Sequence, residues 1–232
     1  MTINTIEYDD RATATRAIAE QLARDLGQAL ADRETAVFLA SGGNSPRPVL
    51  EALAQADLDW SRVIVSLSDE RCAPEDHDHC NMAMVTDALA NGPAAQARTV
   101  ALWEAGDTNY EAAVKRLNAM LAPLMPFDVS LIGMGLDGHT ASIFPAGAGM
   151  DHARTGPGPF AATEPDPLPD EAPWPRITAT LPALAQVRSQ HLMLIGAEKI
   201  ALFKRLMATD PAAPITALAT ASGNKLTAHC CG

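Results

Sequence analysis

Apolar and polar positions follow one another along the chain in an order that predicts helices and strands in turn. Ile18, Leu22, Leu26 and Leu30 recur every four residues between charged residues and glutamines, which predicts an amphipathic helix over about 10–32. Short apolar runs, several rich in β-branched residues, indicate strands at 35–40, 62–67, 99–102, 127–134, 191–195 and 214–218. Further helices are expected at about 49–53, 81–90, 109–121 and 196–207.

Strands that alternate with helices predict an α/β fold. They are typical of a mostly parallel, Rossmann-like sheet with helices on both faces. The 232 residues suffice for one large domain, and we expect residues 1–232 to form one. Residues 145–175 differ, because they hold eight of the seventeen prolines and four glycines. We predict a structureless excursion near the functional site there, and a linker between two half-size domains is the alternative.

Composition narrows the class of protein. Hydrophobic residues make up 47% of the chain, enough for a buried core and too many for a disordered chain. The net charge of −11 argues against nucleic-acid binding, although a few local cations could still hold a small phosphorylated ligand. The N-terminal residues lack the basic flank and apolar core of a signal peptide, and no apolar run is long enough to span a membrane. We therefore expect a cytoplasmic protein that binds neither nucleic acid nor membrane.

The cysteines and histidines of one polar loop could be taken for a metal site. Cys72, His77, His79 and Cys80 are possible zinc ligands, but their spacing fits no common zinc pattern. We expect no metal there. The four cysteines of the chain are too few for a disulfide scaffold, so free thiols are predicted.

Three predicted strands end in unusual polar loops, and ligands of open parallel sheets bind beyond the carboxyl ends of strands. The first loop is Ser41-Gly42-Gly43-Asn44-Ser45-Pro46. Two glycines permit close approach of the backbone, and the amides of the following helix are unpaired, which together suit a phosphate. The alternative is a plain tight turn in which Ser45 caps the helix.

The second loop places three charged residues directly after a buried strand. Asp69, Glu70 and Arg71 are costly there unless they pair with one another or meet a ligand. Arg71 could hold an oxyanion or a phosphate, while the two carboxylates could bind sugar hydroxyls or fix Arg71. An internal ion-pair cluster that closes the strand is the alternative.

The third loop is the glycine-rich run 133–142, which contains Gly135, Asp137 and His139. It looks superficially like a dinucleotide fingerprint, but Asp137 would repel a pyrophosphate and the run does not follow the first strand. We therefore expect no NAD. A histidine on a glycine-rich turn at a strand end is well placed for general base catalysis near neutral pH. A structural histidine is the alternative.

Five segments together resemble a known family. They are Ser41–Pro46, Ser68–Pro74, Gly133–Pro145, Arg176–Pro182 and Gly196–Lys199. In this order they are similar to the glucosamine-6-phosphate isomerase/6-phosphogluconolactonase family, over about residues 10–220. The deaminase branch of that family typically carries Asp-Glu-Tyr in the second loop and Ile-Ala-Phe-Asn after the histidine. This chain has Asp-Glu-Arg and Thr-Ala-Ser-Ile-Phe-Pro, so it resembles the lactonase branch.

The chain also departs from the family pattern at three places, one of which is Cys72-Ala73, where the family tends to have valines. Cys80 precedes Asn81 where the family usually has serine, and the tail 225–232 lacks the usual tryptophan and aspartate. The departures leave the proposed base untouched.

The resemblance implies hydrolysis of 6-phospho-D-glucono-1,5-lactone to 6-phosphogluconate, a reaction of the oxidative pentose phosphate pathway. Opening an activated cyclic ester needs a positioned water, a base and donors for the oxyanion, with no metal and no redox cofactor. We expect His139 to be the base, Arg71 to lie near the reacting end, and Asp137 to orient the loop or the sugar. The residues expected to bind the phosphosugar lactone are Ser41, Gly42, Gly43, Asn44, Ser45, Asp69, Glu70, Gly135, Arg176 and Lys199.

Two other functions stay open at this point. The same loops could serve proton transfer in a sugar-phosphate isomerase or deaminase, which would release ammonia from glucosamine 6-phosphate. A regulatory protein that binds a sugar phosphate without turnover is the second.

Overall fold

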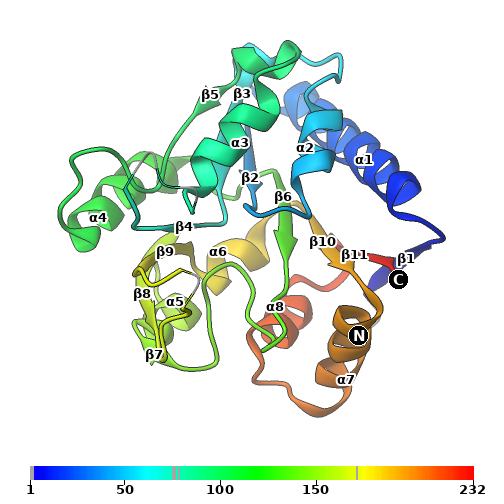
Figure 1. Ribbon diagram of the computed structural model, residues 1–232. Helices are drawn as coiled ribbons and strands as arrows, with labels where there is room; N and C mark the ends of the chain where they lie inside the picture. Colours follow the sequence, from blue (N-terminus) through cyan, green and yellow to red (C-terminus); the bar gives the residue numbers. More distant parts are fainter. Residues whose placement is uncertain (1–2, 75–76, 78, 171) are drawn as a thin grey trace.

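The structure, a computed structural model, describes residues 3–74, 77, 79–170 and 172–232 (Figure 1). Its central element is a seven-stranded sheet in which all neighbouring strands are parallel. In spatial order the strands are β1 (Asn4–Tyr8), β11 (Leu226–Cys231), β10 (Ser189–Ile195), β6 (Val129–Gly133), β2 (Ala36–Ala40), β3 (Val63–Leu67) and β5 (Arg98–Thr99). The predicted parallel α/β class is thereby confirmed.

Helices cover both faces of this sheet. The eight α-helices of the described residues are α1 (Arg11–Asp32), α2 (Arg47–Leu53), α3 (Asn81–Leu89), α4 (Tyr110–Leu121), α5 (Met150–Thr155), α6 (Leu181–Gln186), α7 (Ala197–Thr209) and α8 (Pro214–Ser222). Helix α1 packs on β2, β6 and β10, with α2 and α3 beside it, while α6, α7 and α8 lie together on the other side (Figure 1). In the described part of the chain, none of the helices has the length and apolar character that a bilayer crossing requires.

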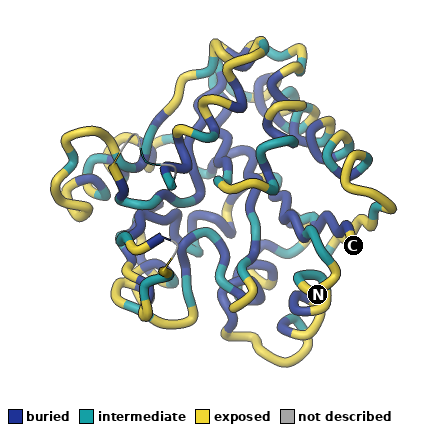
Figure 2. The backbone as a smooth tube through the Cα atoms, viewed as in Figure 1, coloured by how far each residue is buried: buried dark blue, intermediate teal, exposed yellow. Residues whose placement is uncertain are grey.

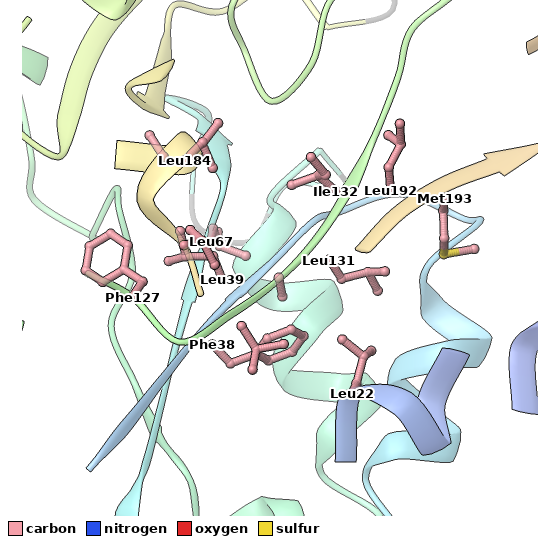
Figure 3. Close-up of a cluster of buried hydrophobic side chains, with 14 of the residues drawn as sticks. Leu22, Phe38, Leu39, Leu67, Phe127, Leu131, Ile132, Leu184, Leu192 and Met193 are labelled. Atoms are coloured by element: carbon pink, nitrogen blue, oxygen red, sulfur yellow. The ribbon is translucent and has the colours of Figure 1, made fainter. Parts of the chain in front are cut away.

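The core follows the alternation of side chains along the strands. In Figure 3, Leu22 of α1 lies on the same side of the sheet as Phe38 and Leu131, whereas Ile132 and Leu192 point to the other side. The central strands are buried on both faces, which explains why their sequences are almost entirely apolar (Figure 2). A continuous core of this kind fixes the carboxyl ends of the strands in place.

A second, smaller sheet includes part of the proline-rich segment 145–175. Its four antiparallel strands are β4 (Asp69–Arg71), β9 (Arg176–Ala179), β8 (Phe160–Pro165) and β7 (Gly147–Ala148). The prediction that 145–175 lacks structure was wrong in this respect, since β7, α5 and β8 all lie in it. Its prolines and glycines stand mostly between these short elements, and composition alone did not reveal the pairing of β8 with β9.

One other expectation, at the C-terminal end, was also wrong. The run 214–218, predicted as a strand, begins helix α8, whose buried residues Ile215, Leu218, Ala219 and Ser222 follow a helical spacing. The last strand is instead β11, formed by the tail between β1 and β10. A five-residue apolar run has no decisive period, and Pro214 is well suited to the first turn of a helix.

Candidate active site

A pocket of about 340 Å³ opens at the carboxyl ends of β2, β3, β6 and β10. From β2 the chain continues to β3 on one side, while β6 is followed by β10 on the other. The pocket therefore lies at the topological switch point, the usual ligand site of such sheets. The predicted site residues that line it are Ser41, Gly42, Gly43, Asn44, Ser45, Asp69, Arg71, Gly135, His139 and Lys199. Glu70, Asp137 and Arg176 do not line it.

The loop after β6 holds the histidine by a tight turn. The amide of Gly135 donates to the carbonyl of His139 at 2.9 Å, and Gly138 adopts a left-handed φ of 84°. A Cβ on Gly135 would lie 2.1 Å from Cε1 of His139, so only glycine leaves room for the ring in this position. On its other side the ring packs against Phe144, with 4.3 Å between the ring centroids. The imidazole is thus held between a glycine and an aromatic ring.

Asp137 contacts this histidine although only one residue separates them. Its Oδ1 lies 2.6 Å from Nδ1 of His139 and also accepts from the backbone amide of His139 at 3.0 Å. Burial raises the pKa of the Asp137 carboxyl, but the hydrogen bonds and charge of His139 outweigh it, so the pKa is lower than usual. The ionised carboxylate accepts Nδ1–H, and Nε2 of the neutral ring is then the nitrogen with a free lone pair.

Glu70 is turned away from the pocket and is completely buried. Its carboxyl accepts hydrogen bonds from the backbone amides of Arg71, Asn81 and Met82, each at 2.8 Å. Two of these amides are unpaired donors at the start of α3, so Glu70 caps that helix. Burial raises the pKa of this carboxyl, while the three amides act in the opposite direction. The geometry does not support the expected contact of Glu70 with substrate.

Asp69 is the carboxylate of this loop that does face the pocket. Its two oxygens accept from the hydroxyls of Ser68, at 3.0 Å, and Ser142, at 2.7 Å. Ser142 is itself buried and follows the histidine loop. It therefore joins the second and third loops. An internal ion-pair cluster of Asp69, Glu70 and Arg71 is not what the described residues form.

The arginines and the lysine have different surroundings. Arg176 is buried and donates to the carbonyls of Ala172, at 2.8 Å, and Trp174, so its guanidinium is directed at the backbone rather than into the pocket. Burial, and next the charge of Arg71, lower its pKa. Lys199, in the first turn of α7, does line the pocket. Arg71 and Lys199 are consequently the two cationic side chains that both line the pocket and were predicted from the sequence.

The first loop has the open backbone that the sequence indicated. Gly43 adopts a left-handed φ of 98°, which favours glycine. A Cβ on Gly42 would come within 1.8 Å of Oδ1 of Asn81, so the loop approaches α3 very closely. Ser45 does not cap the next helix, because α2 has Pro46 at its N-cap and no side-chain cap. The hydroxyl of Ser45 is therefore not engaged in capping α2.

The pattern of the family described as glucosamine-6-phosphate isomerases/6-phosphogluconolactonase matches residues 9–227. The chain belongs to this family. A 6-phosphogluconolactonase of Pseudomonas aeruginosa is 38% identical over 206 residues, covering 88% of this chain and 84% of that protein. One from Neisseria meningitidis is 36% identical over 198 residues, 85% of each chain. A crystal structure of a 6-phosphogluconolactonase from Shewanella baltica has a TM-score of 0.90 at 28% identity, covering 100% of this chain and 98% of that one.

The resemblance to the glucosamine-6-phosphate isomerase/6-phosphogluconolactonase family seen in the motifs is thereby confirmed. The motifs did not point to every residue of the pocket, however. Asn81, Met193 and Ile195 also line it. Asn81 could have been suspected as a polar residue at a helix start after the second loop. The two apolar residues look like ordinary strand residues, and only the position of β10 brings them to the pocket.

Proposed function

We propose that the protein is a 6-phosphogluconolactonase, which hydrolyses 6-phospho-D-glucono-1,5-lactone to 6-phosphogluconate with His139 as general base. The observation that carries the proposal is His139, held by Asp137, at the wall of a pocket that Arg71 and Lys199 also line. The family relationship supports it, because the relatives described above are 6-phosphogluconolactonases. The cytoplasmic location expected from the sequence is part of the same proposal.

The proposed chemistry begins with a water positioned between the histidine and C1 of the lactone. Nε2 of His139 takes a proton from this water as its oxygen attacks C1, while Asp137 stabilises the imidazolium that forms. Arg71 donates to the oxygen that becomes negative in the tetrahedral intermediate. The C1–ring-oxygen bond then breaks, and the ring oxygen receives the proton from His139. The product is a carboxylic acid, which ionises and releases one proton to solvent.

The phosphate of the substrate needs a separate set of donors. We place it at the backbone of Gly42 and Gly43, the hydroxyl of Ser45 and the ammonium of Lys199. Lys199 stands in the first turn of α7, whose unpaired amides also favour an anion. Glu70 and Arg176 are left out of this proposal, since their side chains bind other partners.

The test of the proposed function is hydrolysis of freshly generated lactone, followed by oxidation of the 6-phosphogluconate formed and compared with the spontaneous rate. We expect a clear acceleration at nanomolar enzyme. Release of ammonia from glucosamine 6-phosphate would instead identify a deaminase. Binding of 6-phosphogluconate with no acceleration of hydrolysis would identify a binding protein and contradict the proposal.

Replacing Gly135 by alanine is expected to lower kcat by about 10²-fold. The added methyl group would displace the His139 ring, and a misplacement of about 1 Å can cost that much. Steady-state kinetics on fresh lactone measure the effect. Gly27→Ala in the middle of α1 is the matched control, because its added Cβ meets only Leu58 at 3.5 Å. Equal kcat values for the two variants would contradict the idea that ring placement is critical.

A further inference from the structure

Asn81 is a pocket residue to which the proposed reaction gives no role. It is the first residue of α3 and only 3% exposed. Its Oδ1 accepts a hydrogen bond from Nη1 of Arg71, and its Nδ2 donates to the carbonyl of Asp69 at 2.9 Å. One side chain thus joins two neighbouring residues of the second loop to the start of a helix.

An asparagine at a helix start usually caps the helix itself. Here the carboxyl of Glu70 takes that role, since it accepts from the amides of Asn81 and Met82. The N-cap residue Cys80 makes no side-chain cap. Because Glu70 pairs the helix amides, the side chain of Asn81 is available to hold Arg71.

The groups that hold Arg71 are all neutral among the described residues. Nη1 donates to the amide oxygen of Asn81 and to the carbonyl of His79, the latter at 3.0 Å. The two nearest carboxyls in sequence have other partners: Glu70 faces backbone amides, and Asp69 accepts from two hydroxyls. Within the described ranges no carboxylate forms an ion pair with Arg71.

We propose that Asn81 is a positioning residue that aims Arg71 through an uncharged acceptor and so leaves its positive charge for the anionic ligand. An aspartate has the same shape and would hold the guanidinium equally well, but it would form an ion pair with it. An aspartate also loses the hydrogen bond that Nδ2 of Asn81 donates to the carbonyl of Asp69, and that loss does not require Arg71. The part of any difference that depends on Arg71 therefore measures the charge effect. The inference rests on the proposed function only for the identity of the ligand.

The experiment compares Asn81→Asp with Asn91→Asp, which makes the same chemical change at an exposed residue just beyond the other end of α3. Calorimetry gives the Kd of 6-phosphogluconate, and kinetics on fresh lactone give kcat/KM. We expect about 10- to 100-fold weaker binding for Asn81→Asp than for Asn91→Asp, the range of one charge-assisted contact.

A double-mutant cycle with Arg71→Ala shows whether the effect acts through Arg71. In that background the loss caused by Asn81→Asp should shrink to about twofold or less. If Asn81→Asp melts far below the wild type, Asn81→Ala is measured in the same double-mutant cycle and replaces it as the test. It should also weaken binding, and again only when Arg71 is present.

Three results would overturn the inference. The first is equal affinity of Asn81→Asp and Asn91→Asp, and the second is a loss that persists in full without Arg71. The third is a wild type that binds neither 6-phosphogluconate nor inorganic phosphate. A wild type that shows the expected cycle for 6-phosphogluconate binding but does not hydrolyse the lactone would contradict the proposed function and leave this inference standing.

Discussion

Replacement of His139 by alanine is expected to lower kcat on fresh lactone by about 10²–10⁴-fold, with a much smaller change in KM. This is the usual contribution of a general base, and the variant removes the ring whose Nδ1 is held by Asp137 at 2.6 Å. Stopped-flow or coupled kinetics at saturating lactone, corrected for spontaneous hydrolysis, measure it. A near-normal kcat would show that His139 is not the base.

Two further variants separate the base from a merely structural histidine. Asp137→Asn keeps the size of the side chain, but its amide can donate to Nδ1 and leave the proton on Nε2, where it blocks base catalysis. It should therefore lower kcat as well. His152 is an exposed histidine on α5, so His152→Ala serves as the control for loss of a histidine. A large rise in KM with unchanged kcat for His139→Ala would indicate substrate binding instead.

Acid is expected to destabilise the folded protein through a chain of hydrogen bonds that runs from β1 through β11 and β10 to α1. Tyr8 OH lies 2.8 Å from Nδ1 of His229, whose Nε2 lies 3.0 Å from Nδ1 of His191. Nε2 of His191 lies 2.9 Å from Oδ2 of Asp25 on α1. With both rings neutral, each group donates to the next in this order, ending at the carboxylate. A second proton on His229 would reverse the hydrogen bond with Tyr8 and place a positive charge at a buried ring.

The pKa values give the direction and the range of this effect. Burial, and next the charge of His191, lower the pKa of His229 from 6.5 to about 3. Burial raises the pKa of Asp25, but its hydrogen bonds from His191 and Ser189 outweigh this, so its pKa is lowered too. Between pH 6.5 and 3 the unfolded chain binds a proton at His229 that the folded protein does not. The free energy of unfolding therefore decreases as the pH is lowered, by about 1.4 kcal/mol per pH unit from His229 alone.

Over that window the contribution of His229 to the free energy of unfolding falls by about 5 kcal/mol, a large part of the stability of an ordinary domain. Urea unfolding of the wild type and of His229→Gln between pH 7 and 4 measures it. Glutamine cannot be protonated, so the wild type should lose its advantage over the variant as the pH falls. His152→Gln controls for removal of a histidine as such. A difference between wild type and His229→Gln that does not vary with pH would contradict the expectation.

The sequence by itself was sufficient for the fold class and for most of the pocket. Parallel strands that are buried on both faces are mostly apolar along their whole length, so β2, β3 and β6 were recognisable from short runs. Because the carboxyl ends of parallel strands meet at one edge, the loops that follow them were predicted to converge. His139, Arg71 and the Ser41–Ser45 loop do line one pocket.

Side-chain direction could not be predicted in the same way. Asp69, Glu70 and Arg71 are adjacent in sequence, yet Asp69 and Arg71 line the pocket and Glu70 is buried under α3. Pairing of β4 with β9 sends alternate side chains to opposite faces, and this pairing joins segments about a hundred residues apart. The direction of Arg176 on β9 likewise depends on carbonyls of the preceding turn.

The clearest division lies between local pattern and long-range partners. The local sequence pattern was sufficient to predict that the loops after the strands form a polar site. The spacing of apolar residues and the turn-forming residues determine structure over only a few positions, so both can be recognised in the sequence. Only the tertiary structure decided that 214–218 is a helix, that the tail is β11, and that Asp137 turns to His139. These outcomes depend on which groups lie nearby in space, and a buried polar group such as Glu70 adopts the orientation in which its hydrogen bonds are satisfied.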